Sequence, residues 1–248
     1  MGKGLGGCAG GRLLAGGVVL SVGLAGTALC MGADLWGGSL GITNDYVVRG
    51  ITRSNNRAAL QLDLHYMNTS GVVAGLFASN TQIDPGEPRD VEISGFLGFA
   101  WNPGSDWRGK ILASHYSYPW SHDGSRYDYD ELDLELAYQN WLSASLVYSP
   151  NAPRYLPYRG LFGVTSKSAE ISLQRPVLGK LSATAGIGYS HLSGPEAAGY
   201  AYFSIGGAYD LAPVSLALSY VDTTAGANAL FYNAAASGRW TGTVIWRF

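Results

Sequence analysis

The feature that most constrains the fold of this chain is a strict two-residue alternation of apolar and polar side chains. In residues 131–138, with the sequence ELDLELAY, the acids Glu131, Asp133 and Glu135 fall on one face, and the leucines and Tyr138 fall on the other. A helix would scatter the three acids around its circumference, whereas a β-strand places them all on one side. The segment therefore predicts a half-buried strand.

The same alternation recurs along the chain after residue 38 and predicts about twelve strands. Several of these segments end in a tyrosine on the apolar face, as expected for a membrane–water interface. The expected strands are residues 39–53, 58–68, 72–82, 91–101, 107–118, 129–139, 141–149, 166–175, 180–191, 199–210, 213–222 and 238–248.

The connections between these strands alternate between short turns and longer loops. Residues 68–71 and 102–106 are short, whereas 150–165 and 223–237 are long, and only the first expected loop, 54–57, departs from this alternation. Short turns at one end and long loops at the other are typical of an even-stranded transmembrane barrel with periplasmic turns and external loops. The predicted fold is thus an all-β, antiparallel, up-and-down transmembrane barrel, with a soluble β-sandwich as the alternative.

The N-terminal segment has the pattern of an export signal. Lys3 and Arg12 are followed by an uncharged, apolar and small-residue stretch that ends at Cys30, which matches a basic region and an apolar region before a cleavage site. We expect residues 1–33 to be a signal peptide and residues 34–248 to be the barrel domain. Both cysteines lie in the signal, so the exported domain has none to form disulfides.

Composition excludes several other classes of protein. Charged residues make up only 14% of the chain and the formal net charge is −2, which offers no basic face for nucleic acid. Two cysteines, and histidines without a metal-binding spacing, indicate neither a metal site nor a cofactor. What remains is a glycine- and aromatic-rich β protein.

The chain ends in a strand with an aromatic terminus. Trp240, Val244, Trp246 and Phe248 share one face of this strand, and Arg247 lies on the other face. A terminal phenylalanine after alternating apolar residues resembles the signal that bacterial barrel assembly machinery recognises. Trp246 and Phe248 are therefore the expected assembly signal.

The mature chain also resembles the TorF family of outer-membrane porins. The most specific part of this resemblance is TNDYVVRGITRSNNRAALQ (43–61), and GVVAGLFASN (71–80) is similar to a glycine-rich strand of the family. Residues 127–131 and 218–223 are similar to later strands. The resemblance implies a pore in the outer membrane of a Gram-negative bacterium and leaves the solute unnamed.

If the apolar faces point to lipid, parity gives the side chains that line the lumen. A polar lumen would let hydrophilic solutes diffuse, and because acids outnumber bases here, we expect a weak preference for cations. The alternative is a lumen filled by paired side chains, which gives a structural or adhesive barrel without transport. The expected pore-lining residues are Asp45, Arg49, Asp63, His65, Glu92, Asp133, Glu135, Glu170, Arg239 and Arg247.

An outer-membrane lipid hydrolase is a further alternative, because twelve-stranded phospholipases exist. The one G-x-S-x-G match, residues 37–41, lies at the start of the first strand with no helix after it, so it does not predict a nucleophile elbow. We therefore expect no enzyme. The expected partners are outer-membrane lipid and lipopolysaccharide, the barrel assembly machinery, and a small hydrophilic solute.

Overall fold

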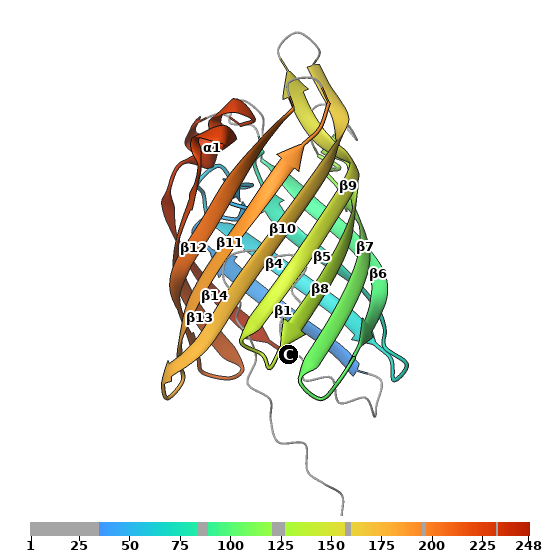
Figure 1. Cartoon of the computed structure of the whole chain (residues 1–248), viewed down its shortest axis with the longest axis vertical. Coiled ribbons are helices and arrows are strands. Elements are labelled where there is room, and N and C mark those ends of the chain that lie inside the picture. Colours follow the sequence, from blue (N-terminus) through green and yellow to red (C-terminus); the bar gives the residue numbers. More distant parts are fainter. Residues whose placement is uncertain (1–34, 84–88, 121–126, 157–159, 195–196, 232) are drawn as a thin grey trace, which may run out of the picture.

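The computed structural model describes residues 35–83, 89–120, 127–156, 160–194, 197–231 and 233–248. The expected signal peptide lies outside these residues. Twelve antiparallel strands form one closed barrel in which every strand pairs with its neighbours in the chain and β1 pairs with β14 (Figure 1). The barrel strands are β1 (Leu35–Thr43), β4 (Ala59–Met67), β5 (Val72–Thr81), β6 (Asp90–Trp101), β7 (Trp107–Ser117), β8 (Tyr129–Tyr138), β9 (Leu142–Leu156), β10 (Gly160–Leu178), β11 (Leu181–Leu192), β12 (Ala198–Asp210), β13 (Val214–Thr223) and β14 (Arg239–Arg247).

Within the described ranges, four short elements are not part of the barrel wall. The strands β2 (Val47–Val48) and β3 (Ile51–Thr52) pair with each other, and η2 (Ala225–Ala229) and α1 (Asn233–Ala236) lie between β13 and β14. Among the described residues, no helix is long and apolar enough to cross a membrane.

The alternation of side chains closes the barrel with an apolar outside and a polar inside. Leu60, Leu97 and Ile205 point outward and are each about 60% exposed, whereas Asp63 and Ser79 point inward and are 4% and 1% exposed. A one-residue shift in the register of a strand would move its apolar side chains into the lumen and its polar side chains to the outside. The alternation therefore fixes the register of each strand. The interior also contains small apolar clusters, such as the one formed by Met67, Val73, Phe96, Ala100 and Leu112.

The two ends of the barrel differ in the length of their connections. At the end that holds Phe248, here called the turn end, consecutive strands are joined by short turns such as residues 139–141. At the opposite end, called the loop end, the connections include residues 44–58 and 224–238 (Figure 1). This confirms the predicted alternation and the even strand number.

Two of the expected connections were wrong. The first strand ends at Thr43 rather than at residue 53, so the first loop is residues 44–58 and is long like the others. Most of the expected loop 150–165 is instead an extension of the β9–β10 hairpin, in which Pro153 pairs with Gly163 and the register shifts once, between Val164 and Ser166. Prolines are tolerated in a strand near such irregularities, which is why their presence did not break this hairpin.

The apolar outer face of the barrel predicts which substitutions destabilise the protein in a lipid bilayer. Leu146 points outward from the middle of the barrel part of β9 and is 58% exposed, while its neighbour Ser145 points inward. Replacing Leu146 by arginine should destabilise the bilayer-folded state by about 2–4 kcal/mol, the cost of an arginine on the lipid face near the midplane. Reversible folding into lipid bilayers measures this difference. Ser145→Arg is the matched control, and an equal loss in both variants would contradict the assigned faces.

Candidate functional site: a lumen narrowed by the first loop

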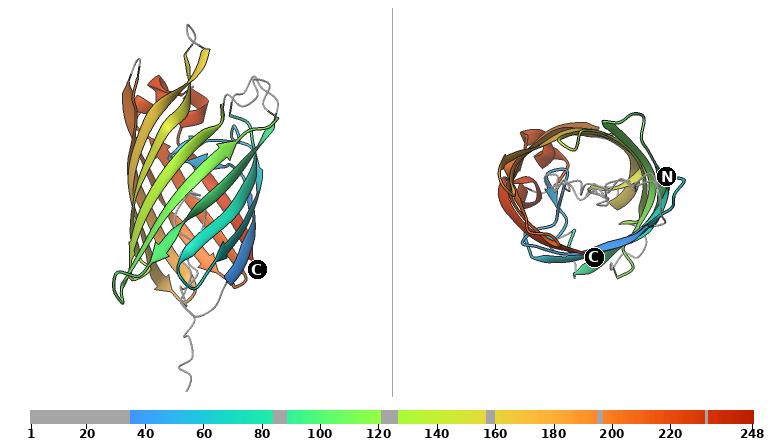
Figure 2. Two further views of the ribbon diagram at one scale, coloured as in Figure 1. Left: turned by 90° about the vertical axis from the view of Figure 1, so that its right-hand side faces the viewer. Right: turned by 90° about the horizontal axis from the view of Figure 1, so that it is seen from below.

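The first loop, residues 44–58, folds back into the barrel instead of extending away from it (Figure 2, right). Its strands β2 and β3 are joined by Arg49 and Gly50, both with positive φ (50° and 81°), which is the left-handed region that a tight hairpin turn requires. A Cβ on Gly50 would lie 2.5 Å from Thr223 Cγ2 and 2.9 Å from Tyr202 Cβ. The tip of the loop is therefore packed against β12 and β13.

Asp45 fixes the base of this loop. It accepts hydrogen bonds at Oδ1 from the hydroxyls of Thr52 and Ser54, and at Oδ2 from Arg239 Nη1 at 3.0 Å. Arg239 also donates to the carbonyls of Ala234 and Ala235 at the end of the last loop. One buried carboxylate and one arginine thus hold the first and last loops together at the loop end.

Arg49 ties the tip of the loop to the barrel wall. Its two terminal nitrogens each donate to one carboxylate oxygen of Glu131 on β8, both at 2.8 Å. The side chains are only 13% and 7% exposed. A bidentate arginine–carboxylate pair in this setting is both strong and directional, so the loop is held across the interior rather than resting loosely in it.

A group of tyrosines surrounds the rest of the loop. Glu92 accepts hydrogen bonds from the hydroxyls of Tyr46 in the loop, at 2.8 Å, and Tyr118 next to β7. Arg53 donates to the hydroxyls of Tyr118 and Tyr129 at 3.5 and 3.4 Å, and its guanidinium lies 5.8 Å from the centre of the Tyr129 ring. These contacts fill the side of the lumen next to β6–β8 at the loop end.

Apolar packing fixes the other side of the loop. Ile51 of β3 belongs to a buried cluster with Tyr200 and Tyr202 of β12 and with Ala235 and Ala236 of α1. Phe231 packs edge-on against Tyr200, with ring centres 5.8 Å apart. Part of the last loop therefore covers the first loop, and together they narrow the lumen at the loop end.

Other charged side chains face the lumen closer to the turn end. Asp63 Oδ1 and His65 Nδ1 are 2.6 Å apart, and Lys110 Nζ lies 2.9 Å from Glu135 Oε2. Asp133 is buried on the inward face of the same strand as Glu135. Lys110 on β7 and Glu135 on the neighbouring strand β8 thus compensate each other's charge along this wall.

The wall formed by β10–β14 is lined by small polar side chains. Glu170 accepts hydrogen bonds there from the hydroxyls of Tyr202 and Ser172, at 2.9 and 3.1 Å. Arg247 Nη1 bonds the hydroxyl of Ser215 nearer the turn end. Short side chains leave more of the lumen unfilled than long ones. The inward hydroxyls on this wall include Ser166, Ser168, Ser182, Thr184, Ser190, Ser204, Ser219, Thr241 and Thr243.

The ten residues expected to line a pore lie on the inner side of the barrel, and their role in a pore stays a prediction. Two of them do not come from the expected element. Asp45 and Arg49 come from the inward loop and not, as expected, from the first strand. Two important residues are absent from the expected set: Glu131, although it shares its face with Asp133, and Arg53. Trp246 and Phe248 point outward and are 45% and 56% exposed, and their role in assembly stays a prediction.

The residues considered for catalysis are divided between the two faces of the wall, although Ser39 of the G-x-S-x-G match pairs with Asp63 on β4, which contacts His65. The G-x-S-x-G match lies within strand β1, without the strand-to-helix turn of a nucleophile elbow. His65 faces the lumen, His115 and His191 lie on outward positions of β7 and β11, and His122 lies outside the described residues.

Solved structures with a similar fold include outer-membrane channels. The NanC porin has a TM-score of 0.51 at 9% sequence identity, with 85% of this chain and 98% of that chain covered. An outer membrane channel from Pseudomonas putida F1 has a TM-score of 0.50 at 14% identity, with 87% and 96% covered. At such low identity these likenesses show the fold alone. No curated protein sequence is similar enough to count as a relative.

The sequence itself matches a family model over residues 33–246. That model is described as Gcw_chp, a bacterial protein family of unknown function. The narrower TorF label stays a prediction. Since the match spans nearly the whole barrel, the chain belongs to the Gcw_chp family.

Proposed function

We propose that this protein is an outer-membrane channel for the passive diffusion of small hydrophilic solutes. The observation that carries the proposal is the partition of side chains across the closed barrel wall: Leu60, Leu97 and Ile205 lie outside, while Asp63, Glu92 and Ser79 lie inside. Covering this outward apolar surface with lipid is favourable, by about 25 cal/mol per Å² removed from water. A polar interior in such a barrel is the architecture of a diffusion channel.

The inward first loop is the constriction of this channel. It reaches across the loop end from Asp45, beside β14, to Glu131 on β8. Solutes pass the part of the lumen that the loop leaves unfilled, along the small polar side chains of β10–β14. The hydroxyls there replace the hydrogen bonds that a polar solute loses when it leaves water.

A weak preference for cations belongs to the same proposal. Arg49, Arg239 and Lys110 are matched by acids, which reduces the net field of the lumen. Glu92 and Glu170 accept hydrogen bonds from tyrosine and serine hydroxyls, and a negative charge on either carboxylate attracts cations.

Liposome swelling tests whether solutes pass. Liposomes that contain the purified barrel should swell in isotonic solutions of a monosaccharide and swell more slowly with a trisaccharide, because the narrowed lumen excludes larger solutes. Liposomes of the same lipid without protein are the control. Swelling no faster than this control for every sugar would favour a filled structural barrel over a channel.

A further inference from the structure

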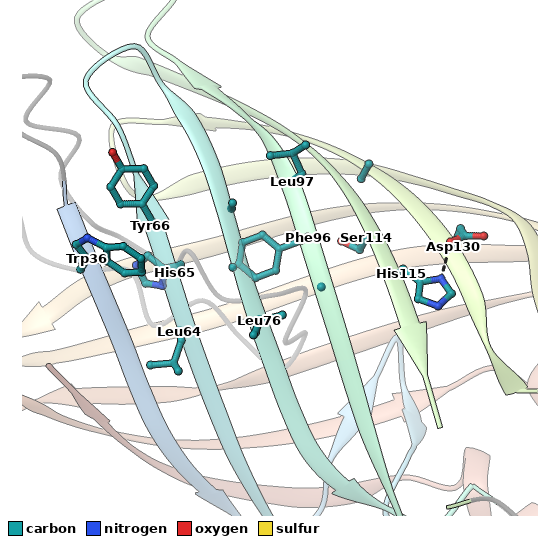
Figure 3. A pocket seen from close by; sticks show the side chains of 14 residues that line it. Trp36, Leu64, His65, Tyr66, Leu76, Phe96, Leu97, Ser114, His115 and Asp130 are labelled. Atoms are coloured by element: carbon teal, nitrogen blue, oxygen red, sulfur yellow. Dashed lines mark hydrogen bonds and ion pairs between the residues drawn. The ribbon is translucent and has the colours of Figure 1, made fainter. Parts of the chain in front are cut away.

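The outer wall carries a row of aromatic side chains at the turn end of the barrel. Trp36 on β1 packs against Tyr66 on β4, with ring centres 4.9 Å apart (Figure 3). Further around the wall, Trp107 on β7 packs against Tyr138 on β8 at 5.0 Å, and Tyr138 contacts the ring of Trp141 at 5.9 Å. Aromatic side chains collect at membrane–water interfaces, so in a membrane this row lies at the level of the lipid headgroups.

Backbone hydrogen bonds fix Trp141 in the turn between β8 and β9. Gln139 and Asn140 have positive φ angles of 46° and 60°, which a tight hairpin turn requires. The Trp141 amide donates to the Tyr138 carbonyl at 3.1 Å, and the Trp141 carbonyl accepts from the Gln174 amide of β10 at 2.8 Å. The ring of Trp141 therefore has a fixed place between the ring of Tyr138 and β10.

Arg175 on β10 lies over the ring of Trp141. Its guanidinium carbon is 3.9 Å from the ring centre, and its strand position, opposite Ala183, belongs to the exposed outward face. In the described part of the chain, no carboxylate forms an ion pair with this guanidinium. Stacking orients the guanidinium plane and leaves its N–H groups able to bind two oxygens of one phosphate.

Small and aliphatic side chains continue from Arg175 toward the middle of the wall. Ala183 and Ala185 on β11 are outward positions that pair with Arg175 and Leu173 on β10. Leu173 and Ile187 beside them are 40% and 61% exposed. The two alanines therefore form a shallow strip between larger apolar side chains, which suits an acyl chain whose phosphate lies at Arg175.

We propose that Arg175 and Trp141 hold the phosphate of a glycerophospholipid, with an acyl chain along Ala183 and Ala185. In an outer membrane the short turns face the periplasm, and the leaflet on that side consists of glycerophospholipids, whereas lipopolysaccharide surrounds the loop end. Arginine keeps its charge throughout the physiological pH range, so this recognition of phosphate depends on no titrating group. The site rests on the outer-membrane location of the proposed channel and not on conduction through it.

Native mass spectrometry of the full barrel, with dioleoylphosphatidylglycerol added, measures the fraction of protein that retains lipid. We expect a severalfold lower fraction for Arg175→Gln and for Trp141→Leu than for the parent protein. Arg175→Lys should also lose retention, because an ammonium lacks the planar fork that stacks on the ring and binds two phosphate oxygens. Lys167→Gln is the matched control, since it removes an exposed outward cation from the same strand near the loop end.

Dioleoylglycerol, which has the same acyl chains but no phosphate, separates binding of the headgroup from binding of the chains. The parent protein should retain it less than the phospholipid, and Arg175→Gln should retain it as the parent does. Undiminished retention of the phospholipid by Arg175→Gln or Arg175→Lys would overturn the proposal, and so would an equal loss in Lys167→Gln. Heat-modifiable migration on gels shows that each variant is folded before it is measured.

Discussion

Replacing residues 46–56 by a short glycine–serine turn should raise the single-channel conductance severalfold. This segment contains the hairpin of β2 and β3, which lies inside the lumen and is anchored there by Arg49 and Arg53. Its removal widens the narrowest part of the path, and conductance through a pore increases as its constriction widens. The twelve wall strands keep all of their pairing, because none of them pairs with this segment.

Shortening the β9–β10 hairpin is the matched control for this deletion. Residues 152–156 and 160–162 pair in the upper part of that hairpin, which projects beyond the loop end (Figure 1), and the control variant lacks the segment from 152 to 162. Loss of these residues should leave the conductance nearly unchanged. Equal conductance of the parent and the variant without residues 46–56 would show that the loop does not limit the path.

Breaking the Arg49–Glu131 pair should produce the second large effect, an unstable constriction in an intact barrel. Removing one partner of a buried, hydrogen-bonded ion pair typically costs about 3–5 kcal/mol, because the other charge is left buried. Here the substitution destabilises the docked position of the loop rather than the barrel, since Arg49 is in the loop and Glu131 is in the wall. Arg49→Ala should raise the mean conductance and add rapid fluctuations to the open-channel current.

A double-mutant cycle separates this pair from general damage. Glu131→Ala should act like Arg49→Ala, and the double variant should add little to either, because the interaction is lost only once. Lys110→Ala is the control, since Lys110 and Glu135 join two wall strands and do not touch the loop. Additive effects of the Arg49 and Glu131 substitutions, or equal fluctuations in Lys110→Ala, would show that the pair does not hold the loop.

The two-residue alternation predicts much of this architecture because each wall strand of the barrel has alternate side chains in the lumen and on the outside. Each strand has one face in the lumen, so parity alone placed Asp133, Glu135 and Glu170 inside. The same parity also turned Tyr116 and Tyr129 inward, where they stack with ring centres 4.5 Å apart. The expectation that tyrosines mark the interface therefore fails for these two residues, and for outward residues such as Tyr189, which is 52% exposed, it stays a prediction.

The inward loop is what sequence reasoning could not find. The stretch after the first strand contains the β-branched residues Val47, Val48 and Ile51, which favour strands and continue the alternation. Its local sequence therefore predicts that the first wall strand continues. Its position depends on partners far along the chain: Glu131 is 82 residues from Arg49, and Arg239 is 194 residues from Asp45. Tertiary contacts of this kind override local strand preference. Only the Arg49-Gly50 pair, with its turn-forming glycine, hinted at a hairpin.

Planar-bilayer recording of the purified barrel tests the central claim most directly. The account predicts discrete current steps of uniform size in symmetric potassium chloride, and in a salt gradient a small reversal potential of the sign that favours potassium over chloride. Replacing Glu92 and Glu170 together by glutamine should move that potential towards zero. A folded, inserted barrel that carries no current above the lipid background would contradict the account and leave a closed structural barrel in its place.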